Sequence, residues 1–199
     1  MKSVLIIIVL SFIQFSVFAQ IFPSDLWHDG KLVLVSEDTL VGKLKYDLTK
    51  GIVQVEVGKK LYTHSAKSIF FFTLFDVTSE TYRTFYVLPY GLLSSYKVPV
   101  IFEVLLEGNL TLLCREYKAV KNIQDPYSYG SYSKEYLVYK YFFLDRQGNI
   151  TEYKLKKNDL YNAVIKRQNQ VIKFMKANNL HSDKRIDLIR IISFYNALL

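Results

Sequence analysis

From residue 31 to about residue 157, the hydrophobic side chains recur at every second position, which is typical of antiparallel strands with one buried face. Residues 40–47 (LVGKLKYD) and 52–57 (IVQVEV) show this alternation most clearly. Short segments that contain glycine, LTKG and GKK, separate these runs and predict hairpin loops. This part of the chain therefore predicts an antiparallel meander.

Residues 68–75 (SIFFFTLF) lack the alternation, since they are apolar on both faces of a strand, and they predict a central strand that is buried on both sides. Two hairpins are expected farther along, with turns at Gly108-Asn109 and at residues 146–149. The pattern gives about eight or nine strands, closed as a barrel or stacked as a sandwich. The other strands and hairpins are expected at residues 31–35, 82–90, 99–118 and 136–155.

After residue 157 the hydrophobic period becomes helical. We expect helices over about residues 158–178, with Asn158 as the N-cap, and about residues 184–198. The first has an apolar arc formed by Leu160, Tyr161, Val164, Ile165, Gln168, Val171, Ile172 and Met175. The apolar face of the second contains Ile186, Ile189, Ile192 and Tyr195, widened by Leu188 and Ile191. The predicted fold class is α+β: an antiparallel β meander followed by two C-terminal amphipathic helices.

The first 19 residues resemble a cleaved secretory signal. Lys2 precedes an apolar run over residues 4–18, and Val17 and Ala19 occupy the positions that a signal peptidase reads. A retained membrane anchor is the alternative, but the run is short for a bilayer span of about 20 residues. We therefore predict export to the periplasm or cell envelope, or secretion, and a single domain over residues 20–199.

The chain of 199 residues contains 16 Tyr, 14 Phe and a single cysteine, Cys114. An exported protein with one thiol has no internal disulfide, so packing must stabilise it. Cys114 lies in a strand-like run, where a free cysteine is usually a small buried apolar side chain.

The net charge of +8 is unevenly distributed. Residues 153–190 contain ten basic and three acidic side chains, whereas residues 20–152 are neutral overall. The predicted first helix carries Lys166, Lys173 and Lys176 opposite its apolar arc. This pattern fits a helix that packs on the protein's own core, a helix that lies on an anionic membrane surface, or a nucleic-acid arm. Core packing is favoured because the sheet and second helix can bury the arc, and export argues against nucleic acid.

No catalytic or cofactor motif is present. The three histidines, His28, His64 and His181, lack metal-ligand spacing, and the chain has no phosphate-binding loop, no dinucleotide fingerprint and no nucleophile elbow. We therefore predict no metal site and no cofactor.

Residues 125–136 (DPYSYGSYSKEY) are the most distinctive candidate for binding. Tyrosines alternate there with serine and glycine, a composition that suits adaptable recognition surfaces, because tyrosine gives rigid contact area and serine gives hydrogen bonds. Stacking on sugar rings is one use of such side chains, and a long loop that covers a sheet edge is the alternative. The candidate ligand-binding residues are Tyr127, Tyr129, Tyr132 and Tyr136.

At residues 38–47 (DTLVGKLKYD) and 188–198 (LIRIISFYNAL), the chain resembles a group of uncharacterised exported proteins of Gram-negative bacteria. The resemblance implies a signal peptide, a β-rich body, paired C-terminal helices and residence in the periplasm or envelope. It carries over no catalytic residue.

These observations favour a non-enzymatic binding or structural interaction protein of the cell envelope. The alternatives are a module that binds a carbohydrate or lipid ligand in a pocket of the β body, and a hydrolase without a recognisable motif. The expected partners are another envelope protein, a glycan or an anionic membrane surface.

Overall fold

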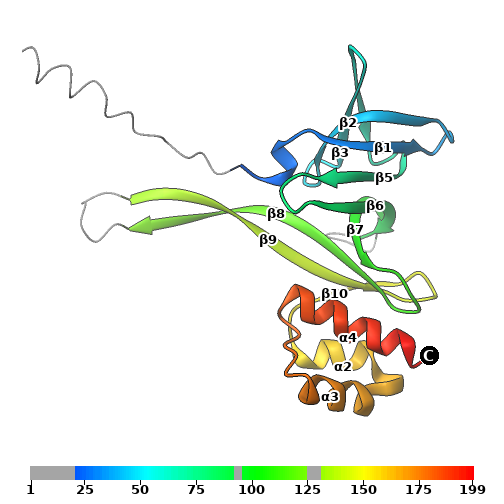
Figure 1. Ribbon diagram of the computed structural model, residues 1–199, viewed down its shortest axis with the longest axis vertical. Coiled ribbons are helices and arrows are strands. Elements are labelled where there is room, and N and C mark those ends of the chain that lie inside the picture. The colour runs from blue at the N-terminus through cyan, green and yellow to red at the C-terminus, as the bar shows by residue number, and fades with distance from the viewer. Residues whose placement is uncertain (1–20, 92–95, 125–130) are drawn as a thin grey trace, which may run out of the picture.

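The structure is a computed structural model in which residues 21–91, 96–124 and 131–199 are described. It confirms the α+β class: a single antiparallel sheet of ten strands is followed by C-terminal helices (Figure 1). The order of the strands across the sheet is β10-β9-β8-β7-β6-β5-β1-β2-β3-β4. The strands are β1 (His28–Leu34), β2 (Thr39–Asp47), β3 (Ile52–Val57), β4 (Lys60–Ser65), β5 (Ile69–Asp76), β6 (Thr81–Tyr90), β7 (Val98–Leu106), β8 (Thr111–Gln124), β9 (Ser131–Leu144) and β10 (Ile150–Tyr153).

Three strands differ most from the expected ones. β4 was not among the expected strands, because its side chains are mostly exposed and give no apolar face to recognise. β8 continues to Gln124 instead of ending at residue 118, and β9 begins at Ser131 instead of residue 136. The added residues are also mostly exposed. The count of eight or nine strands was therefore too low, because strands without a buried face leave no hydrophobic period in the sequence.

The sheet is open, with β4 and β10 as its edges, so it forms neither a closed barrel nor a sandwich. It nevertheless curls, since the hydroxyl of Tyr46 on β2 reaches the carboxylate of Glu116 on β8 at 2.6 Å. Gly30 and Gly42 face each other at the centre of the β1–β2 pair. A Cβ atom at Gly30 would lie 2.2 Å from the carbonyl oxygen of Thr73, and one at Gly42 would lie 2.0 Å from that of Glu56. Only glycine permits this close approach of neighbouring backbones.

The prediction that residues 68–75 are buried on both faces is wrong. β5 is central, between β1 and β6, but only one of its faces lies in the core. Phe70 is 55% exposed and makes an edge contact with the neighbouring ring of Phe71, which stacks on Tyr86. Aromatic pairing on the outer face explains the apolar positions that the sequence pattern assigned to a second core face.

The first predicted helix is divided into three short elements: α2 (Lys157–Ala163), η2 (Ile165–Arg167) and α3 (Gln168–Ala177). Leu160, Val164 and Val171 are fully buried in the core between the sheet and helices, as expected from the apolar arc. Ile165 is 63% exposed, because the tighter turn at η2 rotates it out of that arc. Asn158 is not the N-cap: α2 starts after Lys156, which provides no side-chain cap.

The last helix, α4 (Arg185–Ala197), buries Leu188, Ile191, Ile192 and Tyr195. Ile186, expected on this face, is instead 73% exposed. The Asn196 side chain accepts a hydrogen bond from the Leu110 amide at 2.9 Å and donates one to the Leu110 carbonyl at 3.0 Å. It thereby attaches the end of α4 to the turn between β7 and β8.

Three hydrophobic clusters hold the body together. One lies between the β8–β10 region and the helices, and it contains Cys114, which is buried as expected and whose thiol pKa burial raises to about 12. A second fills the concave side of the curled sheet around Leu44, Phe72 and Phe85. A third and smaller cluster lies around Phe102 and contains Leu113 of β8. The neighbours of Leu113 along the strand, Leu112 and Cys114, belong to the first cluster, because successive side chains of a strand point to opposite faces.

Candidate functional site

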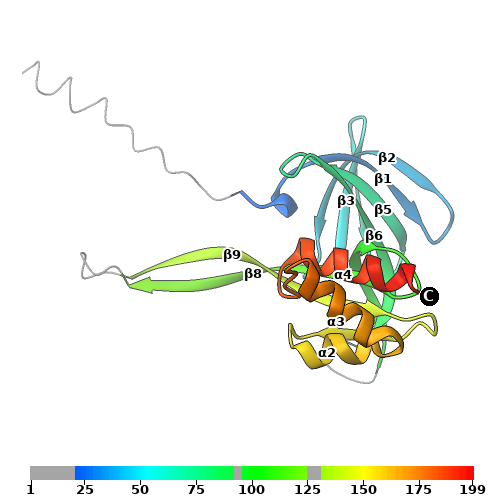
Figure 2. The ribbon, with the colours of Figure 1, turned by 60° about the horizontal axis from the view of Figure 1, so that its bottom comes forward.

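The most prominent feature is a two-stranded ribbon that stands away from the body (Figures 1 and 2). It is formed by residues 115–124 of β8 and residues 131–140 of β9, which pair with each other in an unbroken register. Within the described residues, β7 pairs with β8 only as far as Cys114, and β10 pairs with β9 only from Tyr141 onward. The ribbon therefore has no neighbouring strand on either edge.

The two faces of the ribbon carry different side chains. Two residues that pair directly across neighbouring strands point to the same face of the ribbon. Along one strand, residues two positions apart also point to the same face. One face consists of the successive pairs Ala119–Tyr136, Lys121–Lys134 and Ile123–Tyr132, which we call the lysine face. The other face consists of the pairs Val120–Glu135, Asn122–Ser133 and Gln124–Ser131.

The structure places two of the four candidate tyrosines on the lysine face. Tyr132 is 55% exposed and Tyr136 is 41% exposed, and both belong to a strand instead of a loop. Tyr127 and Tyr129 lie outside the described residues.

The three lysines of the basic helix face are exposed, but they do not extend the lysine face of the ribbon. Lys166 belongs to η2, whereas Lys173 and Lys176 belong to α3. Both views place α3 in the helical layer of the body, away from the ribbon (Figures 1 and 2). The chain therefore presents two separate basic regions.

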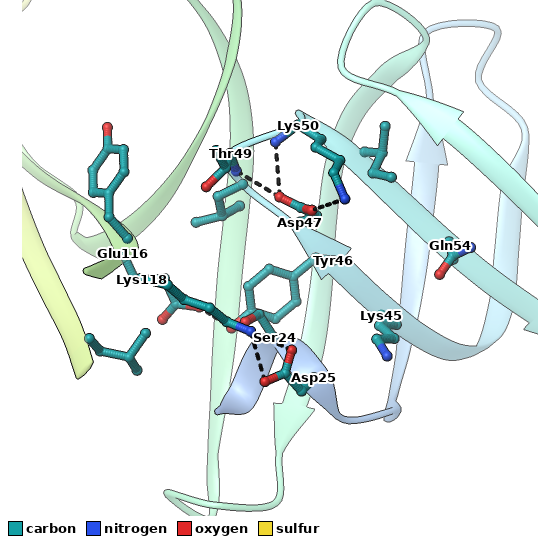
Figure 3. A pocket seen from close by; sticks show the side chains of 14 residues that line it. Ser24, Asp25, Lys45, Tyr46, Asp47, Thr49, Lys50, Gln54, Glu116 and Lys118 are labelled. Atoms are coloured by element: carbon teal, nitrogen blue, oxygen red, sulfur yellow. Dashed lines mark hydrogen bonds and ion pairs between the residues drawn. The ribbon is translucent and has the colours of Figure 1, made fainter. Parts of the chain in front are cut away.

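A polar cleft of about 510 Å³ lies at the base of the ribbon, where the β2–β3 turn and the short helix η1 (Pro23–Asp25) approach β8 (Figure 3). At its edge, the Lys118 ammonium donates to both carboxylate oxygens of Asp25, at 2.6 and 2.8 Å. Asp47 accepts hydrogen bonds from the amides of Thr49 and Lys50, which fixes the β2–β3 turn. The lining is Ser24, Asp25, Lys45, Tyr46, Asp47, Leu48, Thr49, Lys50, Ile52, Gln54, Glu116, Tyr117, Lys118 and Leu137.

Glu116 connects the cleft to a buried charge cluster, which consists of Tyr46, Asp76, Arg83, Glu103, Glu116 and Arg185. The guanidinium of Arg83 lies at its centre and bridges Asp76, Glu103 and Glu116 at 2.9 to 3.1 Å. Arg185 on α4 donates to Glu103 from the helical side at 2.8 Å. The cluster thus joins the concave side of the sheet to the helical layer.

Burial and pairing act against each other in this cluster. Burial alone would lower the pKa of Arg83, but Tyr46, Glu103 and Glu116 raise it above its usual value. Burial raises the pKa of Tyr46, so its hydroxyl stays protonated and donates to Glu116. Each charged group has a partner, and this complete set of bonds indicates a structural connection between sheet and helices.

Arg115 is the one buried arginine, among the described residues, with unpaired nitrogen atoms: its Nη2 donates to the Leu48 carbonyl at 2.6 Å, whereas Nε and Nη1 have no hydrogen-bond partner. Burial lowers the pKa of its guanidinium. The rings of Phe102 and Tyr117 lie 5.7 and 5.3 Å from it and provide cation–π contacts in place of a carboxylate.

The histidines are dispersed, and the described part of the chain contains no group of three or more potential metal ligands. The ring of His28 is buried and its Nε2 lies 2.7 Å from the carbonyl oxygen of Pro23, which anchors η1.

Among the described residues, no helix is both long and apolar enough to cross a membrane. Comparison of the chain with protein-family models, curated proteins and solved structures found no match.

Sequence reasoning missed the cleft, the charge cluster and the two-faced ribbon. The cluster has a signal in hindsight, since Asp76, Arg83, Glu103 and Glu116 each occupy an inward position of a strand where the alternation calls for an apolar residue. The sequence gives only a weak indication of the ribbon, because the ribbon has no buried face that would produce a regular hydrophobic pattern.

Proposed function

We propose that this protein is exported to the cell envelope and acts by binding, without catalysis of its own, and that the ribbon is the part that contacts the partner. The proposal depends mainly on one observation: the ribbon projects from the body while exposing Val120, Tyr132 and Tyr136.

A two-stranded hairpin that packs against nothing is marginally stable in water. Residues 115–118 at the base of the ribbon still bond to the body, but residues 119–124 and 131–136 extend beyond these contacts, at about 3.4 Å per residue. Exposed tyrosines combine an apolar ring with a hydroxyl group and are enriched where one protein surface recognises another molecule. A partner that covers the ribbon accounts for both its length and its exposed rings.

Export supports the choice of an envelope partner. The apolar run over residues 4–18, followed by Ala19, has the features of a signal peptide. The resemblance to exported proteins of Gram-negative bacteria points in the same direction.

Site-specific photocrosslinking in the native host tests this proposal. A photoreactive phenylalanine analogue at Tyr132 or Tyr136 is expected to give adducts of higher mass. The control position is Tyr82, which is 81% exposed and lies on β6 of the body. Adducts from Tyr82 and none from the ribbon would contradict the proposal.

The second candidate function is binding of a small polar ligand in the cleft, as in the carbohydrate alternative. The lining of the cleft, with Lys45, Asp47 and Gln54, suits a hydroxylated molecule better than a lipid chain. Amide chemical shifts measured with a panel of monosaccharides would place such a ligand: changes at Thr49 and Gln54 indicate the cleft, and changes at Tyr132 indicate the ribbon.

A further inference from the structure

The lysine face contains a repeating arrangement of rings and charges. Along the ribbon, a pair with one tyrosine (Ala119–Tyr136) is followed by a pair of two lysines (Lys121–Lys134) and then by a second pair with one tyrosine (Ile123–Tyr132). Successive pairs on one face are two residues apart, or about 7 Å. The face therefore presents a ring, a double positive charge and a second ring within about 14 Å.

The two lysines are placed directly opposite each other. Like charges in this arrangement destabilise a strand pair, so their side chains repel unless an anion lies between them. Among the described residues, no ion pair forms at either ammonium group, and the two carboxylates of the ribbon, Glu116 and Glu135, lie on the other face. A negatively charged ligand would relieve this repulsion.

The flanking tyrosines restrict the kind of anion. Each ring has an apolar surface that can stack on a flat partner and a hydroxyl group that can form hydrogen bonds. The face is part of an open, twisted ribbon (Figure 1), and its lysines and tyrosines are exposed. These features suit a linear polymer that lies along the ribbon.

We infer that the lysine face binds an anionic polysaccharide, with sugar rings stacked on Tyr132 and Tyr136 and carboxylate or sulfate groups between Lys121 and Lys134. The inference rests on the proposed function, because it names the partner of the same ribbon. A membrane surface fits less well, since Ile123 is the sole bulky aliphatic side chain of the face that could enter hydrocarbon. A nucleic acid fits less well because two lysines are few for a polymer with a charge on every phosphate.

The test measures binding of the purified protein to polygalacturonate at physiological ionic strength. The double variant K121Q/K134Q is expected to bind about tenfold more weakly or worse, because two charge contacts are lost. The matched control K166Q/K173Q removes two exposed lysines from η2 and α3, gives the same net charge, and should stay within about twofold of the native protein. Equal losses in both variants would overturn the inference, since binding would then follow net charge alone.

The tyrosines are tested separately. Y132A/Y136A is expected to weaken binding about fivefold or more without altering net charge, because stacking area is lost. The control Y62A/Y82A removes two exposed tyrosines from β4 and β6 and should leave binding unchanged. Unchanged binding by Y132A/Y136A would contradict the assignment of the rings.

Three further probes distinguish the alternatives: neutral dextran, vesicles with phosphatidylglycerol, and oligo(dT). If the vesicles or oligo(dT) bind more tightly than polygalacturonate, and if K121Q/K134Q weakens that binding about tenfold, the inference of a polysaccharide ligand is overturned. The lysine face would then be assigned to the ligand that binds more tightly. If Tyr132 gives crosslinked adducts in cells but the purified protein does not bind polygalacturonate, the inference fails and the proposed function stands. If neither is observed, both fail.

Discussion

Arg83 and Arg115 are both almost fully buried, but their guanidinium groups have opposite surroundings. Arg83 has three carboxylates around it, whereas Arg115 has one backbone carbonyl and two aromatic rings. A buried arginine with a full set of partners is difficult to remove, because its loss leaves several charges unpaired in a region of low dielectric constant.

Replacing Arg83 with Met is expected to reduce the free energy of unfolding by about 3–5 kcal/mol, since Asp76, Glu103 and Glu116 would lose their common partner. Urea unfolding followed by circular dichroism measures the loss. Lys43→Met is the control, because its ion pair with Asp29 is solvent-exposed and contributes about 1 kcal/mol or less. A loss in Arg83→Met as small as that of the control would show that the cluster does not stabilise the fold.

Asp76 gives the cluster a predictable pH dependence. Burial alone would raise its pKa, but hydrogen bonds from Thr78 and the charge of Arg83 lower it below the ordinary value of 3.8. The folded state therefore favours the carboxylate, and this contribution is present above the ordinary pKa and is lost as the pH falls through the lowered one. As the pH falls from about 5 through the lowered pKa, Asp76→Asn is expected to lose less stability than the native protein. Asp29→Asn, which is exposed, should follow the native curve.

At the scale of elements, the curl of the sheet depends on β1 and β2. Gly30 and Gly42 face each other there, and neighbouring carbonyl groups occupy the space that a side chain would need. The curl in turn brings Tyr46 to Glu116, so the position of the cleft depends on two residues without side chains.

Replacing Gly42 with Ala is expected to destabilise the protein by about 1–3 kcal/mol, because the new Cβ would lie 2.0 Å from the carbonyl oxygen of Glu56 and force β2 and β3 apart. Chemical denaturation measures this change. Val41→Ala in the same strand is the control, since Val41 is 66% exposed and its truncation should cost about 0.5 kcal/mol or less. Equal effects would mean that the close approach is not required.

Elements with a buried face were predictable from the sequence, and elements without one were not. The alternation over residues 40–47 and 52–57 predicted β2 and β3, because one face of each packs in the core. β4 and the outer part of β9 have no such face, so their strand conformation comes from pairing with a neighbour. The break at η2 was also missed, because a tighter turn leaves the apolar positions Val164 and Val171 in place and displaces only Ile165.

At the scale of the whole molecule, the protein consists of a packed body and an extended ribbon. The helices and the curled sheet enclose the hydrophobic clusters. The ribbon adds no buried residue to them, and Tyr139 at its base packs against the first cluster. Composition singles out Tyr132 and Tyr136 as candidates, but it does not reveal the pairing of Lys121 with Lys134, since that pairing depends on the register of two strands.

Shortening the ribbon should therefore preserve the body. Deleting residues 119–136 and joining Lys118 to Leu137 through Asn-Gly is expected to change the free energy of unfolding by about 1 kcal/mol or less, because no core contact is removed. Urea unfolding provides the measurement. In the native protein, amide hydrogen exchange should be fast at Val120 and Tyr132 and slow at Leu113 and Phe142. A large loss of stability on shortening would contradict this division.

The two unpaired backbone edges of the ribbon also bear on self-assembly. Exposed strand edges tend to pair with those of other copies, and lysines are a common means of preventing it. Two ribbons aligned side by side would bring four ammonium groups together, and their mutual repulsion would oppose such pairing at neutral pH. A polyanion that neutralises these groups would remove that barrier, and sedimentation velocity with rising polygalacturonate should then show oligomers. The abundance of the ligand would thus decide whether the protein acts alone or as a lattice.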